Sequence, residues 1–213
     1  MRSRSLIPLA VALSACNLAD AQVKGTGTAR TEARAVGGFT SVSAGGAVEL
    51  TITIGGATAV SVTADDNIVP LIRTRVQGDR LIIDSTDGYT PKTPVRIAIT
   101  TPRLTALGLS GATTAATTGI TGDRFALDLS GASEATVAGA ATAITVEASG
   151  ASELDATRLA AQDATVAASG ASQVRLAVAR GLTVQASGAS AVDYWGSPAV
   201  TKATSGASRV RAR

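Results

Sequence analysis

Residues 125–174 read FALDLSGASEATVAGAATAITVEASGASELDATRLAAQDATVAASGASQV and contain the sequence Ser-Gly-Ala-Ser three times. Across the whole chain, Ser-Gly-Ala occurs six times, at spacings of 18 to 20 residues. A short motif at a nearly constant period is typical of a solenoid, in which each repeat buries its apolar face only against its neighbours. The first two residues of the six copies are Ser110, Gly111, Ser130, Gly131, Ser149, Gly150, Ser169, Gly170, Ser187, Gly188, Ser205 and Gly206.

Apolar and polar residues alternate on both sides of each motif. Phe125, Leu127 and Leu129 precede the second copy at alternate positions, and Glu153-Leu154-Asp155 follows the third. A period of two predicts strands. Two or three short strands joined at tight bends make one coil of a β-helix, so we predict an all-β parallel β-helix (solenoid) with coils of about 18–20 residues.

The Ser-Gly-Ala-Ser motif is interpreted as a structural corner. Glycine adopts a positive φ at a sharp bend, and the alanine after it is small enough to sit inside the bend. The serine hydroxyls are expected to bond to the backbone or to one another along the stack. A nucleophilic role for these serines is not favoured, because the residue order differs from that of serine hydrolases and the chain has no histidine.

The N-terminal residues have the form of a secretory signal peptide. Arg2 and Arg4 precede an apolar run over residues 6–15, too short to span a bilayer. The run ends in Leu-Ser-Ala before Cys16, which is the lipobox pattern of bacterial lipoproteins. Lipidation of Cys16 predicts a membrane partner through the N-terminal lipid anchor. The competing site, Ala-Asp-Ala at residues 19–21, would release a soluble periplasmic protein.

The rest of the chain divides by composition. After the signal peptide of residues 1–15 and the lipobox ending at Cys16, residues 16–34 are small and polar and predict a flexible tether. Residues 35–213 are expected to form a single β-helix domain. Larger strands or a cap are expected over residues 35–105, and the repeat coils over residues 106–213.

Composition excludes several kinds of chemistry. The absence of histidine and the single cysteine exclude Ser-His-Asp triads, zinc helices of the HExxH type and cysteine-rich metal clusters. We therefore expect no catalytic residues, no cofactor and no metal. Removing Arg2 and Arg4 with the first fifteen residues leaves 17 basic and 16 acidic residues, a net charge of +1, which does not favour a nucleic-acid partner.

Equivalent positions after each motif are expected to form columns along the stack. Glu134 and Glu153 would then be neighbours one strand spacing apart, where they could share a proton or hold a hard cation such as calcium. The alternative is that both carboxylates point into water. A second column has alternating charges that would specify register: Thr136, Asp155, Arg175, Asp193 and Arg211.

The ladder of motifs, the sequence Gly-Asp-Arg-Leu-Ile-Ile at residues 78–83 and the sequence Tyr-Trp-Gly-Ser-Pro at residues 194–198 carry a resemblance. From about Phe39 to Arg211, the chain resembles the putative auto-transporter adhesin head GIN domain family. The resemblance implies a right-handed parallel β-helix exported to the bacterial envelope, often behind a lipobox. It supplies no catalytic or binding residues for transfer.

Three classes of function follow. The first is an exported outer-membrane lipoprotein with a non-catalytic, adhesion-like β-helical domain, whose partner is a polysaccharide or a protein. Two alternatives stand beside it: a polysaccharide-active β-helical enzyme with carboxylates in a groove, and a structural envelope spacer without a ligand. The sequence leaves the ligand, the oligomeric state and the orientation at the membrane open.

Overall fold

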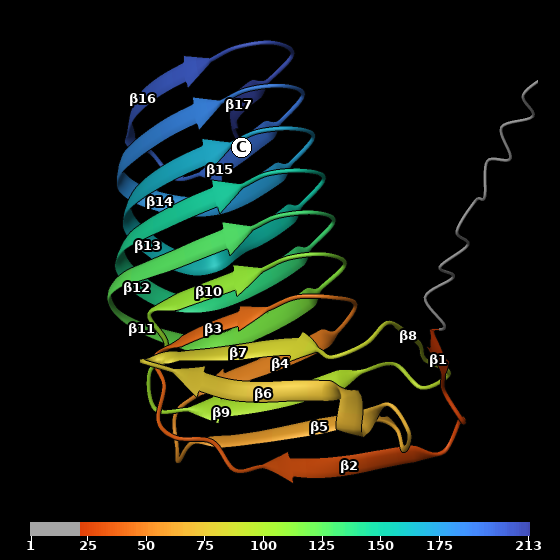
Figure 1. Ribbon diagram of the computed structural model, residues 1–213. Helices are drawn as coiled ribbons and strands as arrows, with labels where there is room; N and C mark the ends of the chain where they lie inside the picture. Colours follow the sequence, from red (N-terminus) through yellow and green to blue (C-terminus); the bar gives the residue numbers. More distant parts are fainter. Residues whose placement is uncertain (1–21) are drawn as a thin grey trace, which may run out of the picture.

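The computed structural model describes residues 22–213. The expected signal peptide, Cys16 and residues 16–21 of the expected tether lie outside the described residues. The described residues form an all-β solenoid, and the predicted parallel β-helix is confirmed. Figure 1 shows its coils stacked along one axis, with the later repeats at the top. Within the described part, the single helical element is a 3-10 turn at Val69–Leu71.

Twelve strands build the coils through parallel pairing. They are β3 (Ser41–Ala44), β4 (Glu49–Ile54), β7 (Arg80–Ser85), β9 (Arg96–Thr101), β10 (Ala106–Leu109), β11 (Thr114–Leu129), β12 (Glu134–Ala148), β13 (Glu153–Ala168), β14 (Gln173–Ala186), β15 (Ala191–Trp195), β16 (Ala199–Thr204) and β17 (Arg209–Ala212). The remaining strands are β1 (Val23–Lys24), β2 (Ala29–Arg34), β5 (Ala59–Asp65), β6 (Ile72–Gln77) and β8 (Tyr89–Thr90).

Each coil contributes to two faces. The post-motif face consists of the residues that follow each corner, from β9 and β4 through the first halves of β11–β14 to β15 and β17. The pre-motif face consists of the residues that precede each corner, from β7, β3 and β10 through the second halves of β11–β14 to β16. Side chains alternate between solvent and the space enclosed by the coil, as period-two alternation requires.

The core consists of columns of equivalent side chains. One column contains Leu127, Val146, Val166 and Val184, which are in register from coil to coil and at most 2% exposed. The next contains Leu129, Ala148, Ala168 and Ala186, so the coil tapers toward its corner. Stacking similar side chains buries apolar surface in every coil. Each Å² of apolar surface removed from water stabilises the folded state by about 25 cal/mol. Small residues therefore suffice for a continuous core.

The corner glycines have the backbone geometry expected of a sharp bend. In all six copies φ lies between 69° and 74°. Successive corners also touch, because a Cβ built on Gly150 would lie 2.5 Å from the carbonyl oxygen of Gly131. Between the same two coils, the Ala151 amide donates to that oxygen at 2.8 Å. The corner requires glycine for both its conformation and its closeness to the next coil.

The interior of the corner differs from the expectation. Alanine of the motif does not sit inside the bend, since Ala132, Ala151 and Ala171 are exposed. The fourth residue sits there instead, and Ser133, Ser152 and Ser172 are each 1% exposed. The positive φ of the glycine directs the next side chain to solvent and the following one inward. In the copy at Ser187, the inner hydroxyl of Ser190 donates to the Ser187 carbonyl at 2.9 Å.

The expected tether is wrong over residues 23–34. β1 pairs in parallel with β8, and β2 pairs in antiparallel fashion with β5 over six residue pairs. β2 reads Ala-Arg-Thr-Glu-Ala-Arg and lacks apolar alternation, so its sequence resembles a linker. It forms a strand because the edge of β5 supplies backbone partners that composition does not reveal.

Asp65 fastens the N-terminal segment to the fold. Its side chain is buried and accepts backbone hydrogen bonds from Gly27 at 2.9 Å, Lys92 at 2.8 Å and Thr93 at 3.2 Å. Burial alone would raise the pKa of this carboxyl, but the hydrogen bonds from Lys92, Thr93 and Gly27 outweigh that effect and lower the pKa. The ionised carboxylate therefore stabilises the folded state.

We expect Asp65→Asn to destabilise the protein at neutral pH. The lowered folded-state pKa means that the ionised carboxylate stabilises the fold above its ordinary pKa near 4, and that this contribution disappears as pH falls through the folded value. The difference between wild type and variant in guanidinium unfolding midpoint should therefore shrink between about pH 7 and about pH 3. Asp123→Asn, at an exposed position, removes the same charge and is the control. Equal differences at both pH values would contradict the assignment.

Gly150→Ala tests the contact between stacked corners. The added Cβ combines a strained φ of 74° with a backbone contact of 2.5 Å, so we expect a loss of about 3 kcal/mol in the free energy of unfolding. Gly78→Ala is the matched control, because its φ is 64° and nothing lies within 4 Å of the added Cβ. The control should lose only about 1–2 kcal/mol. Equal losses in guanidinium unfolding would show that corner contact is unimportant.

Candidate functional site

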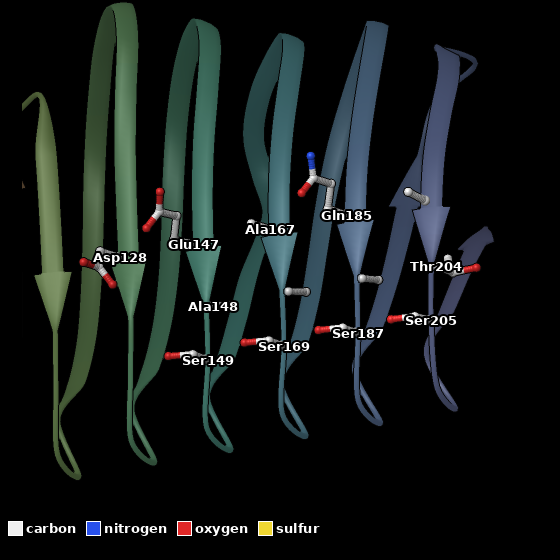
Figure 2. A pocket seen from close by; sticks show the side chains of 13 residues that line it. Asp128, Glu147, Ala148, Ser149, Ala167, Ser169, Gln185, Ser187, Thr204 and Ser205 are labelled. Atoms are coloured by element: carbon white, nitrogen blue, oxygen red, sulfur yellow. The ribbon is translucent and has the colours of Figure 1, made fainter.

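A groove runs along the pre-motif face beside the corners. It encloses about 470 Å³ and crosses the coils of β11, β12, β13, β14 and β16. Figure 2 shows its two rows of side chains, one from the strands and one from the corners. The lining residues are Asp128, Glu147, Ala148, Ser149, Ala167, Ala168, Ser169, Gln185, Ala186, Ser187, Ala203, Thr204 and Ser205.

The groove is shaped by the side chains of one outward column. Asp128, Glu147, Ala167, Gln185 and Ala203 are partners in successive strand pairs. The alanines leave the surface low where the column crosses β13 and β16. The column thus has two neighbouring carboxylates followed by low points on both sides of Gln185, which gives a ligand room to approach the backbone there.

The first serines of four motifs form the second row. Ser149, Ser169, Ser187 and Ser205 lie side by side along the corner, and their hydroxyls point the same way (Figure 2). Strand spacing places equivalent hydroxyls about 4.8 Å apart. A hydroxyl has one proton to donate and lone pairs that accept, so Ser169, Ser187 and Ser205 each offer a donor and an acceptor. Ser149 already donates to the Leu129 carbonyl at 3.5 Å and offers an acceptor.

A column of threonines lies on the same face, two residues before the carboxylate column. Thr145, Thr165, Thr183 and Thr201 are in register and exposed. The pre-motif face thus carries two hydroxyl rows on either side of the groove column. Sequence analysis did not identify these threonines or the groove, although the threonines repeat with nearly the period of the motif.

The groove continues toward the N-terminal coils. A second hollow of about 290 Å³ shares Asp128 and Glu147 with the first and reaches Ser41, Ser43 and Arg80. The whole channel follows the solenoid axis, since its lining comes from successive coils. Two carboxylates lie at its middle, and one guanidinium lies at its N-terminal end.

The structure brings Glu134 and Glu153 to paired positions on the post-motif face, away from the groove. Arg175 forms an ion pair with one of the two, since its Nη1 lies 2.8 Å from Oε1 of Glu153. Calcium takes six to eight oxygen ligands, and no cluster of three acidic, histidine or cysteine side chains occurs in residues 22–213. The arrangement is an exposed salt-bridged surface and does not suit a cation site.

The alternating charge column has the register that the sequence analysis expected. Thr136, Asp155, Arg175, Asp193 and Arg211 are successive partners. Hydrogen bonds from the Thr157 hydroxyl and amide lower the pKa of Asp155, against the opposing effect of desolvation, and Arg175 and Arg158 lower it further. The ion pairs of this face join column members to other positions, Arg175 to Glu153 at 2.8 Å and Asp193 to Arg213 at 2.9 Å, and exposed pairs contribute about 0.2–1 kcal/mol each. The post-motif face therefore carries several ion pairs, whereas the groove is lined by few charged side chains.

Aromatic side chains lie outside the groove. Phe39 and Phe125 are buried in the core, so neither can stack on a ligand. Tyr194 is half-buried, and Trp195 is 37% exposed near the C-terminal end of the post-motif face. A ligand in the groove would accordingly be held by hydroxyl, carboxylate and amide groups.

The sequence of the chain is similar to that of a known protein family. The sequence model of a family described as "Putative auto-transporter adhesin, head GIN domain" matches residues 38–198. No curated protein matches the chain significantly in sequence. In the described part of the chain, no helix is long and apolar enough to cross a membrane.

Solved structures show the same architecture. A protein of Bacteroides fragilis NCTC 9343 described as a putative adhesin matches with a TM-score of 0.67 and 18% identity, over 89% of this chain and 97% of that one. A protein of Parabacteroides distasonis ATCC 8503 described as a putative lipid binding protein matches with a TM-score of 0.56 and 16% identity, over 90% and 99%. A putative adhesin of Parabacteroides merdae ATCC 43184 gives 0.54 and 15%, over 90% and 99%.

Proposed function

The chain belongs to the putative auto-transporter adhesin head GIN domain family, and from this premise we propose that its groove is an adhesion site for a linear, hydroxyl-rich polysaccharide. The observation that carries the proposal is the register of polar groups along the groove, one coil after another. Family membership supports an adhesion-like role. The polar groups of the groove indicate the chemical class of the ligand.

The spacing of the coils favours a glycan over a peptide. Equivalent groups recur about every 4.8 Å along the groove, whereas an extended peptide advances about 3.3 Å per residue and drifts out of step within a few coils. An extended β-linked glycan advances by nearly one coil per sugar. Because successive sugars of a β-1,4-linked glycan are turned over relative to one another, every second sugar can meet an equivalent set of groups, two coils further along.

The groups in the groove suit sugar hydroxyls. Serine hydroxyls and the Gln185 amide donate and accept, and the carboxylates of Asp128 and Glu147 accept. A single hydrogen bond of this kind contributes only about 0.5–1.5 kcal/mol. Binding strength must then come from occupying several coils together, which is an advantage for a protein that attaches to a long polymer.

The repetition of the site also separates binding from catalysis. A hydrolase or lyase needs one unique constellation at the bond it breaks, whereas this groove repeats small polar groups. The polysaccharide-active enzyme remains the alternative for the Asp128–Glu147 pair. One observation distinguishes the two functions. An enzyme would release new reducing ends from the polymer, whereas a binding protein would not.

The binding experiment uses cello- and chito-oligosaccharides of increasing length, measured by isothermal titration calorimetry. We expect affinity to rise with length until the groove is spanned. Ala167→Trp fills the middle of the groove and should lower affinity at least tenfold. Ala160→Trp is the control, because Ala160 is an exposed alanine of the same strand outside the groove lining.

Three results would count against the proposal. Absence of binding to every oligosaccharide by the folded protein would reject it, and so would equal effects of the two tryptophan variants. Release of reducing ends during incubation would favour the enzyme instead.

We also propose that Cys16 is lipidated and holds the domain at the outer membrane. The only cysteine of the chain stands at the lipobox position, and Asn17 follows it. More than one acyl chain anchors a protein stably, whereas a single chain binds only marginally. The family supports an envelope location, while the anchor itself rests on the sequence.

Cys16→Ala should move the protein from the membrane fraction to the soluble fraction, because the variant has no thiol to acylate. Fractionation with a radioactive fatty-acid label measures both location and acylation. Ala21→Val disrupts the competing Ala-Asp-Ala site and leaves the lipobox intact, so it should stay in the membrane fraction with its label. An unlabelled wild-type protein would favour the soluble periplasmic alternative.

A further inference from the structure

We propose that Lys202 closes the C-terminal end of the solenoid to a second copy of this chain. The inference is independent of the groove, because it concerns the end of the stack. A β-helix coil can pair with a further strand as long as its edge is free, and natural sheets guard such edges against self-association. The question is which residues guard the edges here.

The last described coil has a neighbour on one side only. Among the residues that the structure describes, β16 pairs with β14 and β17 pairs with β15, and both strands lie at the top of Figure 1. Val200 is 37% exposed, whereas its partner Leu182 one coil below is 1% exposed. None of residues 22–213 therefore covers the core face of this coil.

Lys202 occupies a core column at this face. It is the register partner of Val184, which continues the column of Leu127, Val146 and Val166. Four apolar side chains are thus followed by an exposed lysine. A strand added to β16 would cover the lysine ammonium with backbone and apolar side chains, and burying an unpaired charge is strongly unfavourable.

The N-terminal end of the stack uses the same device. β2 and β6 are the edge strands there, and Glu32 and Arg34 of β2 lie opposite Val62 and Val60 of β5. Directly opposite residues of an antiparallel pair share a face, so both charged side chains lie on the core side of the sheet. Arg34 bonds to Glu32 at 2.8 Å and to the Val69 carbonyl at 2.7 Å. Charged side chains thus stand on the core side of one edge strand at each end, as an ion pair in β2 and as a single lysine in β16, whereas β6 has Thr74 and Val76 on its core side.

The charge of the C-terminal coil adds to this effect. Residues 199–213 contain Lys202, Arg209, Arg211 and Arg213 and no acidic residue. Arg213 is paired with Asp193 at 2.9 Å, so two such ends meeting about a twofold axis would bring together the like charges of Lys202, Arg209 and Arg211. Without Lys202, the exposed Val200 and half-buried Val210 would offer matching apolar contacts and free backbone edges. The occupant that Lys202 excludes is therefore the same end of a second copy.

The test replaces Lys202 by valine. Lys202→Val should self-associate, reaching about twice the monomer mass at high protein concentration in light scattering after size exclusion, while the wild type stays monomeric. Thr201→Val is the matched control, because it adds the same side chain to the same strand on the outer face. It should remain monomeric.

A double variant keeps the test informative. Val200→Lys combined with Lys202→Val retains one inward lysine and should be monomeric again. Circular dichroism and thermal melting establish that each variant is folded. A folded Lys202→Val that stays monomeric over the whole concentration range would overturn the proposal, as would a wild type that already dimerises through this end. Equal association by Thr201→Val would also overturn it.

Discussion

The structure depends on the hydrogen bonds that each coil makes with the next at a corner that admits no side chain. The Ala151 amide donates to the Gly131 carbonyl, and the same contact recurs from corner to corner. Any Cβ on the glycine would enter this space. Because the corners are fixed, residues close to a motif on either side lie above their counterparts in the previous coil, and the unequal repeat lengths are absorbed by register shifts farther from the corner. The core columns and surface columns both follow from this constraint.

Periodicity then determines what kind of surface the protein presents. A residue type repeated in the sequence becomes a line of equal groups on the molecule, as the serine and threonine rows show. Such a line recognises length and spacing better than it recognises a unique shape. The polysaccharide that we propose as the ligand would match this surface through the regular advance of its units. The charged post-motif face, with its ion pairs from neighbouring coils, is better suited to maintaining register.

Much of the fold could be predicted because its rules are local. The motif spacing identified the coils, and counting from each motif placed Glu134 beside Glu153 and Asp155 beside Arg175, as the register shows. The groove was missed, because its depth depends on small side chains such as Ala167 between larger polar ones. β2 was missed for another reason: its partner β5 is distant in sequence, and its composition resembles a linker.

Because every coil can pair with a further coil, the coils at the two ends of the stack have edges to which another copy of the chain could bind. The same geometry that buries Val184 under a neighbouring coil would bury the next residue of its column under any copy of the chain with a compatible edge. The core of a repeat protein therefore cannot be optimised for apolar burial at its last layer. If Lys202 acts as we propose, charged side chains in core columns of β2 and β16 give up some burial and in return limit stacking by a further copy. Without that limit, coils of separate molecules would be as good neighbours as coils of one chain.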